Sequence, residues 1–89
     1  MRRRYLVSGQ VQGVGFRWFA RAIARRLGVE GWVRNLPSGQ VETEGQGSTE
    51  ALESFEAELR RGPPGSLVTE FAVSEISDEA DNAKMFVVR

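Results

Sequence analysis

Cysteine and histidine are both absent from the 89-residue sequence. Without cysteine, the chain cannot form disulfides, thiol nucleophiles or thiolate metal sites. Without histidine, it lacks the usual general base near neutral pH and the most common metal ligand. Any chemistry that the chain performs must therefore be carried by other side chains and by the backbone.

Long apolar runs are also missing, since no stretch approaches the length of about 18 residues expected of a membrane-spanning helix. The basic start at residues 1–4 resembles that of a signal peptide, but no continuous apolar segment follows it. The composition, 40% hydrophobic and 27% charged, is typical of a soluble globular protein. We expect residues 1–89 to form a single cytoplasmic domain with no membrane contact.

The net charge is zero, yet the two signs are unevenly distributed. Residues 1–34 hold eight arginines and a single acid, Glu30, whereas the other acids lie in residues 35–89. The basic half contains a glycine-rich segment, and this combination favours an anionic ligand. We interpret three of these arginines as the solvent-facing side of a helix: Arg21, Arg25 and Arg26.

The glycine-rich segment, Gly9-Gln10-Val11-Gln12-Gly13-Val14-Gly15-Phe16-Arg17, follows a short apolar strand and opens a helix. Its three glycines let the backbone turn tightly and leave N–H groups open, and the helix N-terminus adds a positive field. Arg17 adds a planar cation that matches phosphate or carboxylate geometry. These features predict an anion cradle for a phosphoryl group. The same pattern is also typical of a purely structural turn with a solvated arginine.

Hydrophobic periodicity predicts two amphipathic helices. Apolar residues recur at helical spacing from Phe16 to Leu27, and Gly28 is placed to cap that helix in the left-handed conformation. A second helix follows an N-cap at Ser48 and is ended by Gly62-Pro63-Pro64. Alternating and short apolar runs predict strands at residues 3–9, 29–35, 40–44, 67–76 and 85–88.

The order of these elements is β-α-β-β-α-β plus a short C-terminal strand. It predicts an α+β, ferredoxin-like split βαβ fold, in which an antiparallel sheet carries two helices on one face. We expect residues 45–47 to end the third strand and residues 78–82 to form a polar loop. In this topology the third strand lies between the first two, which allows the segment after strand one to approach the end of strand two.

Two motifs resemble those of the acylphosphatase family. The first is Val11-Gln12-Gly13-Val14-Gly15-Phe16-Arg17, and the second is Gly31-Trp32-Val33-Arg34-Asn35, followed by Gly39-Gln40-Val41 and Gly45. Gly62-Pro63-Pro64 before the fourth strand is a further family-like feature. The resemblance spans nearly the whole chain, because length, element order and motif spacing all agree. Gln10 and Leu36 depart from the residue types that are common in the family.

The resemblance implies an enzyme that hydrolyses small acyl phosphates to a carboxylate and inorganic phosphate, with no metal or organic cofactor. It implies that Arg17 binds the phosphoryl oxygens and that Asn35 positions the attacking water. It also implies a phosphate-binding loop made of Gln12, Gly13, Val14, Gly15, Phe16 and Arg17.

The residue chemistry agrees with this role. Phosphoryl transfer needs positioning and charge stabilisation more than covalent help, and backbone N–H groups with an arginine supply both. Carboxylate is a good leaving group, so a strong general acid is unnecessary. An asparagine amide can hold a water but cannot act as a base at neutral pH, so the proton is expected to pass to a phosphate oxygen. Asn35 before Leu-Pro-Ser-Gly is also a good turn residue.

Other functions remain open from the residues alone. Ferredoxin-like sheets also bind RNA, and the loop could bind a small anion without turnover. The neutral net charge and the lack of an aromatic-rich strand pair speak against nucleic acid, and we expect a monomer. The remaining candidates are interpreted as surface or packing residues: Glu42 and Glu44 on a solvated strand face, Glu50, Glu53, Glu56, Arg60 and Arg61 on helix surfaces, Trp18 and Trp32 in packing or partial surface cover, and Arg2–Arg4 at a solvated strand start.

Overall fold

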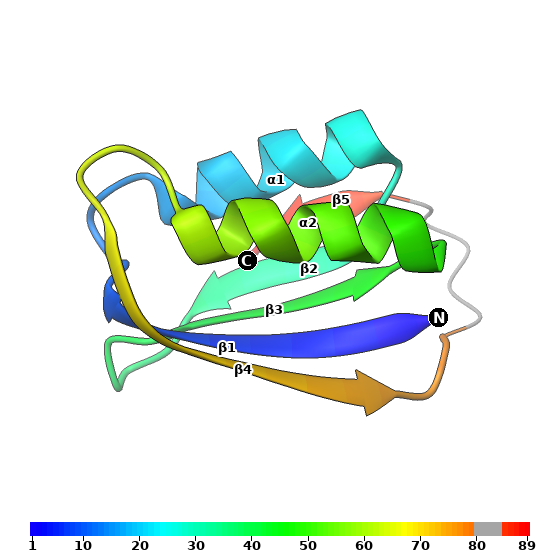
Figure 1. Cartoon of the computed structure of the whole chain (residues 1–89). Helices are drawn as coiled ribbons and strands as arrows, with labels where there is room; N and C mark the ends of the chain where they lie inside the picture. The colour runs from blue at the N-terminus through cyan, green and yellow to red at the C-terminus, as the bar shows by residue number, and fades with distance from the viewer. Residues whose placement is uncertain (80–84) are drawn as a thin grey trace.

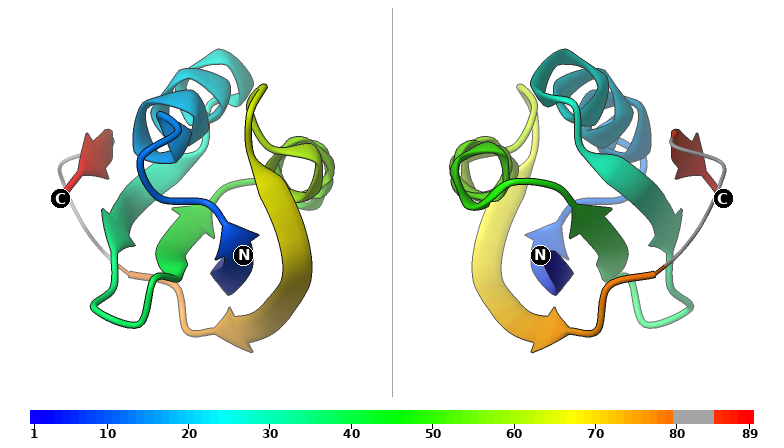
Figure 2. Two further views of the ribbon diagram at one scale, coloured as in Figure 1. Left: turned by 90° about the vertical axis from the view of Figure 1, so that its left-hand side faces the viewer. Right: turned by 90° about the vertical axis from the view of Figure 1, so that its right-hand side faces the viewer.

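The computed structural model describes residues 1–79 and 85–89 and places two helices on one face of a five-stranded sheet (Figure 1). The strand order is β4-β1-β3-β2-β5. The end-on views of Figure 2 show the curved sheet below and the two helices above it. The elements are β1(Arg2–Gln10), α1(Phe16–Leu27), β2(Glu30–Asn35), β3(Val41–Gln46), α2(Thr49–Arg61), β4(Leu67–Ile76) and β5(Phe86–Val88).

The expected ferredoxin-like α+β fold with a short C-terminal strand is confirmed, but the sheet is mixed and not wholly antiparallel. Strands β1 to β4 pair antiparallel, whereas β5 pairs with β2 in parallel and makes the sheet mixed. The register explains why β5 runs parallel to β2. Ile76 at the end of β4 and Phe86 at the start of β5 lie at the same end of the sheet. The chain therefore runs back along the sheet in the direction of β2.

The hydrophobic core lies between the sheet and the helices, where the predicted periodicity places it. Helix α2 begins at the predicted cap, since Ser48 Oγ accepts a hydrogen bond from the Ala51 N–H at 3.1 Å. Phe55 of α2 packs edge-on against Tyr5 and Phe86, with ring centroids 5.8 Å and 5.7 Å apart. The other large, fully buried side chains of this core include Phe16, Leu52, Leu59, Val7, Val11, Val33 and Val41.

The third strand ends within the expected segment 45–47 but two residues later than expected, because β3 continues through Gly45 to Gln46. A Cβ atom on Gly45 would lie 3.0 Å from Val29 Cγ1 and 3.2 Å from Phe55 Cε2. This glycine is therefore needed for the close approach of α2 to the sheet rather than for a turn. The expected loop at residues 78–82 lies partly outside the described residues.

The open face of the sheet is not simply solvated, contrary to the expectation for Glu42 and Glu44. Glu42 is 2% exposed and accepts hydrogen bonds from Arg4 Nε at 2.6 Å and Arg34 Nε at 2.7 Å. Glu44 pairs with the buried Arg2 at 2.8 Å. Burial acts to raise the pKa of Glu42, but the hydrogen bonds and charges of the two arginines outweigh it and hold the pKa below its ordinary value.

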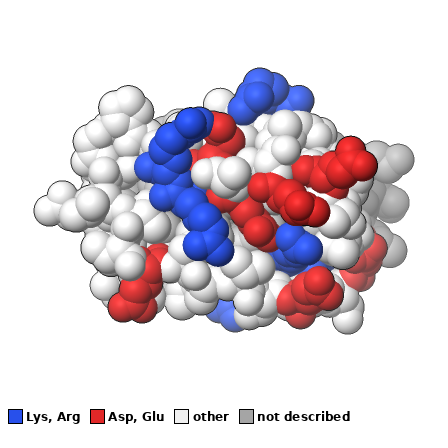
Figure 3. All heavy atoms as spheres, viewed as in Figure 1, with Lys and Arg blue, Asp and Glu red and all other residues white. Residues whose placement is uncertain are grey.

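The helices are short, and the surface around them carries charge of both signs (Figure 3). No helix among residues 1–79 and 85–89 is long and apolar enough to span a membrane. On the face shown in Figure 3, acidic and basic side chains lie interspersed, and neither sign forms a continuous surface.

Candidate active site

The loop between β1 and α1 is shaped by two glycines in the left-handed region. Gly13 has φ 74° and Gly15 has φ 78°, a conformation that costs an L-residue roughly 1–2 kcal/mol. Gly15 is the N-cap of α1 and offers no side chain to the helix N-terminus. The glycines therefore turn the chain sharply and keep the space in front of the helix free of side-chain atoms.

The backbone N–H groups of this turn are available to a ligand. Within residues 1–79 and 85–89, no backbone or side-chain acceptor receives a hydrogen bond from the N–H groups of residues 12–17. The first bond of α1 runs from Phe19 N–H to Gly15 O at 3.0 Å. Open donors at a helix N-terminus form an anion-binding site, because the helix dipole adds a partial positive charge.

The side chain of Gln12 has a structural role that the sequence did not reveal. Its Nε2 donates to the carbonyl oxygens of Leu36 at 2.8 Å and Gln40 at 2.9 Å. These bonds tie the loop after β1 to the turn between β2 and β3. The side-chain amide of Gln12 is thus engaged with the protein, and neither Gln12 nor Val14 is among the residues that line the cavity described below.

The structure brings the two expected catalytic residues to one cavity. Asn35 ends β2 and has the strand parity of the buried Val33, so it lies on the helix side of the sheet. The order β1-β3-β2 places the end of β2 near the loop after β1, as the sequence allowed. A cavity of about 250 Å³ is lined by Val11, Gly13, Gly15, Phe16, Arg17, Trp18 and Asn35.

Asn35 has an unusual feature in this cavity. Its Oδ1 atom is buried and has no hydrogen-bond partner within the described part of the chain. A buried acceptor without a partner costs about 1–3 kcal/mol, so most such atoms in proteins are paired. The side chain therefore keeps an acceptor that no group of the described chain uses.

Arg17 is held in place by a residue that the sequence analysis missed. Its Nη1 donates to the backbone oxygen of Arg89 at 3.1 Å, and Arg89 N–H donates to Val33 O at 2.8 Å. The parallel pairing of β5 with β2 thus brings Arg89 to the guanidinium. The contact joins residues 72 positions apart, and no local sequence signal could have revealed it.

Comparison with known proteins agrees with this geometry. The acylphosphatase family model matches residues 3–88. The chain belongs to the acylphosphatase family. An acylphosphatase of Bifidobacterium longum is 46% identical over 89 residues, which cover 100% of this chain and 92% of that protein. The expected family and the expected class of hydrolase acting on acid anhydrides are confirmed.

Solved acylphosphatase structures share the whole architecture. The crystal structure from Bacillus subtilis has a TM-score of 0.92 and 38% sequence identity, and the match covers 99% of this chain and 97% of that one. The structure from Coxiella burnetii also has a TM-score of 0.92, at 36% identity, covering 99% of this chain and 90% of that one. The comparisons give no support to the alternative of an RNA-binding domain.

The acylphosphatase cavity has no ready-made metal site. In residues 1–79 and 85–89, no group of three or more metal-ligating side chains is found. The lining of the cavity includes no carboxylate. Its polar groups are backbone N–H donors, the Arg17 guanidinium and the Asn35 amide, a set that suits an anion and a water better than a cation.

Proposed function

We propose that this acylphosphatase hydrolyses small acyl phosphates by in-line attack of water in the cavity between the loop after β1 and the end of β2. Arg17 and the N–H groups of residues 12–17 hold the phosphoryl oxygens. Asn35 holds the attacking water through Oδ1. The observation that carries this proposal is the single cavity that Arg17 and Asn35 line together with the glycines of the loop.

The reaction needs no protein base. The water oxygen forms a bond to phosphorus while the bond from phosphorus to the acyl oxygen breaks, and the carboxylate leaves with the electron pair. The proton of the water passes to a phosphoryl oxygen of the substrate. No side chain that lines the cavity is a carboxylate, and the chain has no histidine, so this route matches the groups available.

The rate enhancement is expected to come from fixed charge and fixed geometry. Each donor aimed at developing charge in a preorganised site is worth roughly 3–4 kcal/mol. The N–H groups of the loop lie at the start of α1, and Arg17 is bonded to the backbone oxygen of Arg89, which supports a site whose donors are arranged before the substrate binds. Little reorganisation is then needed in the transition state.

We extend the proposal to the whole of residues 1–89 as one catalytic domain that binds acyl phosphate and releases inorganic phosphate. The monomeric state, the lack of a nucleic-acid partner and the cytoplasmic location stay predictions from the sequence. The alternative of a non-catalytic anion-binding domain predicts phosphate binding without turnover, and one assay separates the two.

The test is hydrolysis of benzoyl phosphate in the presence of EDTA by the wild type, Arg17→Ala and Asn35→Ala. Arg61→Ala serves as a control, since Arg61 lies on the exposed side of α2 and pairs only with Glu58 among the described residues. We expect turnover in the wild type and the control, and at least a 100-fold loss of kcat/KM in the other two. A folded wild type without turnover would refute the proposal and favour the anion-binding alternative.

A further inference from the structure

A second cavity adjoins the catalytic one along helix α1. It measures about 270 Å³ and is lined by Trp18, Arg21 and Arg25 of α1 and by residues 85–88 along β5. Trp18 lines both cavities, so the second one begins where the catalytic one ends. We call the second cavity the α1–β5 groove.

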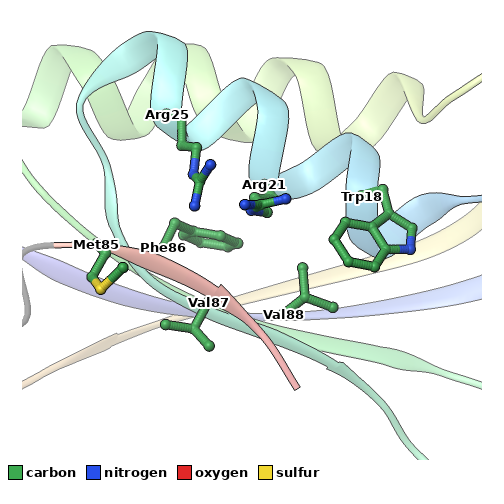
Figure 4. A pocket seen from close by; sticks show the side chains of 7 residues that line it. All are labelled: Trp18, Arg21, Arg25, Met85, Phe86, Val87 and Val88. Carbon is green, nitrogen blue, oxygen red and sulfur yellow. The ribbon is translucent and has the colours of Figure 1, made fainter.

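The α1–β5 groove has an apolar end at Trp18 and is open to solvent. Phe86 is buried beneath it, whereas Trp18 of α1 is 58% exposed. Val88 lies on the same side of β5 as Phe86 and faces α1, whereas the side chains of Met85 and Val87 are directed away from the helix (Figure 4). Figure 4 shows the Phe86 ring between β5 and the arginines of α1, with Val88 directed toward the end at which Trp18 lies. Such a surface gains free energy when the apolar part of a ligand covers it.

The helix side of the groove carries positive charge, and no acidic side chain in residues 1–79 and 85–89 pairs with it. Arg17, Arg21 and Arg25 follow one another at intervals of four residues and therefore share one stripe of α1. None of the three forms an ion pair with any residue in the described ranges, whereas the arginines on the sheet do. Like charges one helical turn apart repel each other, so this stripe costs stability unless an anion binds to it.

The position of each arginine along the stripe sets its distance from the catalytic centre. A rise of 1.5 Å per residue places Arg21 about 6 Å and Arg25 about 12 Å along the axis from Arg17. Arg21 also lies over Trp18, with 5.4 Å between its guanidinium carbon and the ring centroid. Beyond Arg25 the surface changes, because Glu30 lines the next hollow.

We propose that the α1–β5 groove is the subsite for the acyl group, and that it selects acyl phosphates whose apolar acyl chain ends in a second anionic group. The phosphoryl group occupies the catalytic cavity, the chain lies along Trp18 and Val88, and the terminal anion pairs with Arg21 or Arg25. This inference rests on the proposed function, because the phosphoryl position is taken from it.

The experiment compares two substrates of equal chain length. Adipoyl phosphate carries a terminal carboxylate, whereas hexanoyl phosphate ends in a methyl group. We expect the wild type to have a kcat/KM about ten-fold higher for adipoyl phosphate, as one partly exposed charge-assisted hydrogen bond allows. Arg21→Gln and Arg25→Gln should each reduce this ratio and leave hexanoyl phosphate turnover within about two-fold.

The control is Arg26→Gln, which removes the same charge from the same helix but on the side where Arg26 faces Glu58 of α2. It should keep the wild-type ratio, which separates local binding from long-range attraction. A double variant, Arg21→Glu with Arg25→Glu, should reverse the preference toward 6-aminohexanoyl phosphate, whose chain ends in a cation.

The outcomes separate the subsite from the reaction. Equal kcat/KM for adipoyl and hexanoyl phosphate in the wild type would overturn the subsite and leave the proposed function intact. An equal loss of the ratio in Arg26→Gln would also overturn it, because net charge alone would then explain the preference. Failure to hydrolyse either substrate while benzoyl phosphate is turned over would overturn the subsite alone, and failure with all three would overturn both proposals.

Discussion

Replacing Asn35 by alanine should change activity and stability in opposite directions. The substitution removes the buried Oδ1 atom that has no partner in the described structure. Burial of such an atom costs about 1–3 kcal/mol, and its removal offsets the packing lost with the side chain. We therefore expect the free energy of unfolding to stay the same or to rise by up to about 1 kcal/mol, which is roughly 4–8 °C in Tm.

The same substitution should lower kcat at least 100-fold, because the water loses the acceptor that fixes its direction of attack. KM should change little, since the phosphoryl oxygens are held by the loop and Arg17. The two assays are initial rates with benzoyl phosphate and urea unfolding followed by circular dichroism. A matched variant, Asn35→Asp, keeps the shape but adds a negative charge beside the phosphoryl group and should lose activity as well.

The result that would refute this reasoning is a parallel loss. If Asn35→Ala lowered the free energy of unfolding by 2 kcal/mol or more, Asn35 would be a structural turn residue and its oxygen would not be unpaired in solution. If kcat stayed within about two-fold of the wild type, the water would be positioned by another group. Either outcome would separate Asn35 from the reaction.

Three further substitutions test the supports of the site and the sheet. Gly15→Ala should cost about 1–2 kcal/mol in urea unfolding and raise KM, because φ 78° strains an L-residue; unchanged stability would contradict the left-handed turn. Gln12→Ala removes two hydrogen bonds to the β2–β3 turn and should raise KM while it lowers Tm by about 4–8 °C. Glu42→Gln should cost about 2 kcal/mol at neutral pH. Because the folded-state pKa of Glu42 lies below 4.5, its contribution is complete above about pH 5 and is lost as the pH falls, so the variant's stability should depend less on acid pH.

The elements that could be predicted from the sequence are those with local signals. The spacing from Phe16 to Leu27 and the glycine that follows define α1, and its predicted range agrees with the structure. The N-cap at Ser48 defines the start of α2 in the same way. In each case the information lies within one or two turns of the helix, so neighbours in sequence are enough to decide the structure.

The features that escaped prediction depend on distant contacts. Gly45 is typical of a strand break in sequence, yet it lies within β3 because α2 packs closely against it. Glu42 was expected to face solvent, but β1 and β2 place Arg4 and Arg34 on either side of its carboxylate. The support of Arg17 by Arg89 depends on a parallel strand pair at the edge of the sheet. None of these contacts leaves a periodic pattern in the chain.

The sheet order also has a consequence for the rate of folding. Strand β1 lies between two partners that come much later in the chain, since Tyr5 is paired with Thr43 and with Val73. Pairing over such separations is slow, because loop entropy must be lost before the contacts form. The loop after β1 gains its Gln12 anchor only when β2 and β3 are in place. In a refolding experiment, enzyme activity should therefore return with the completed sheet and not with the earlier gain of helical signal.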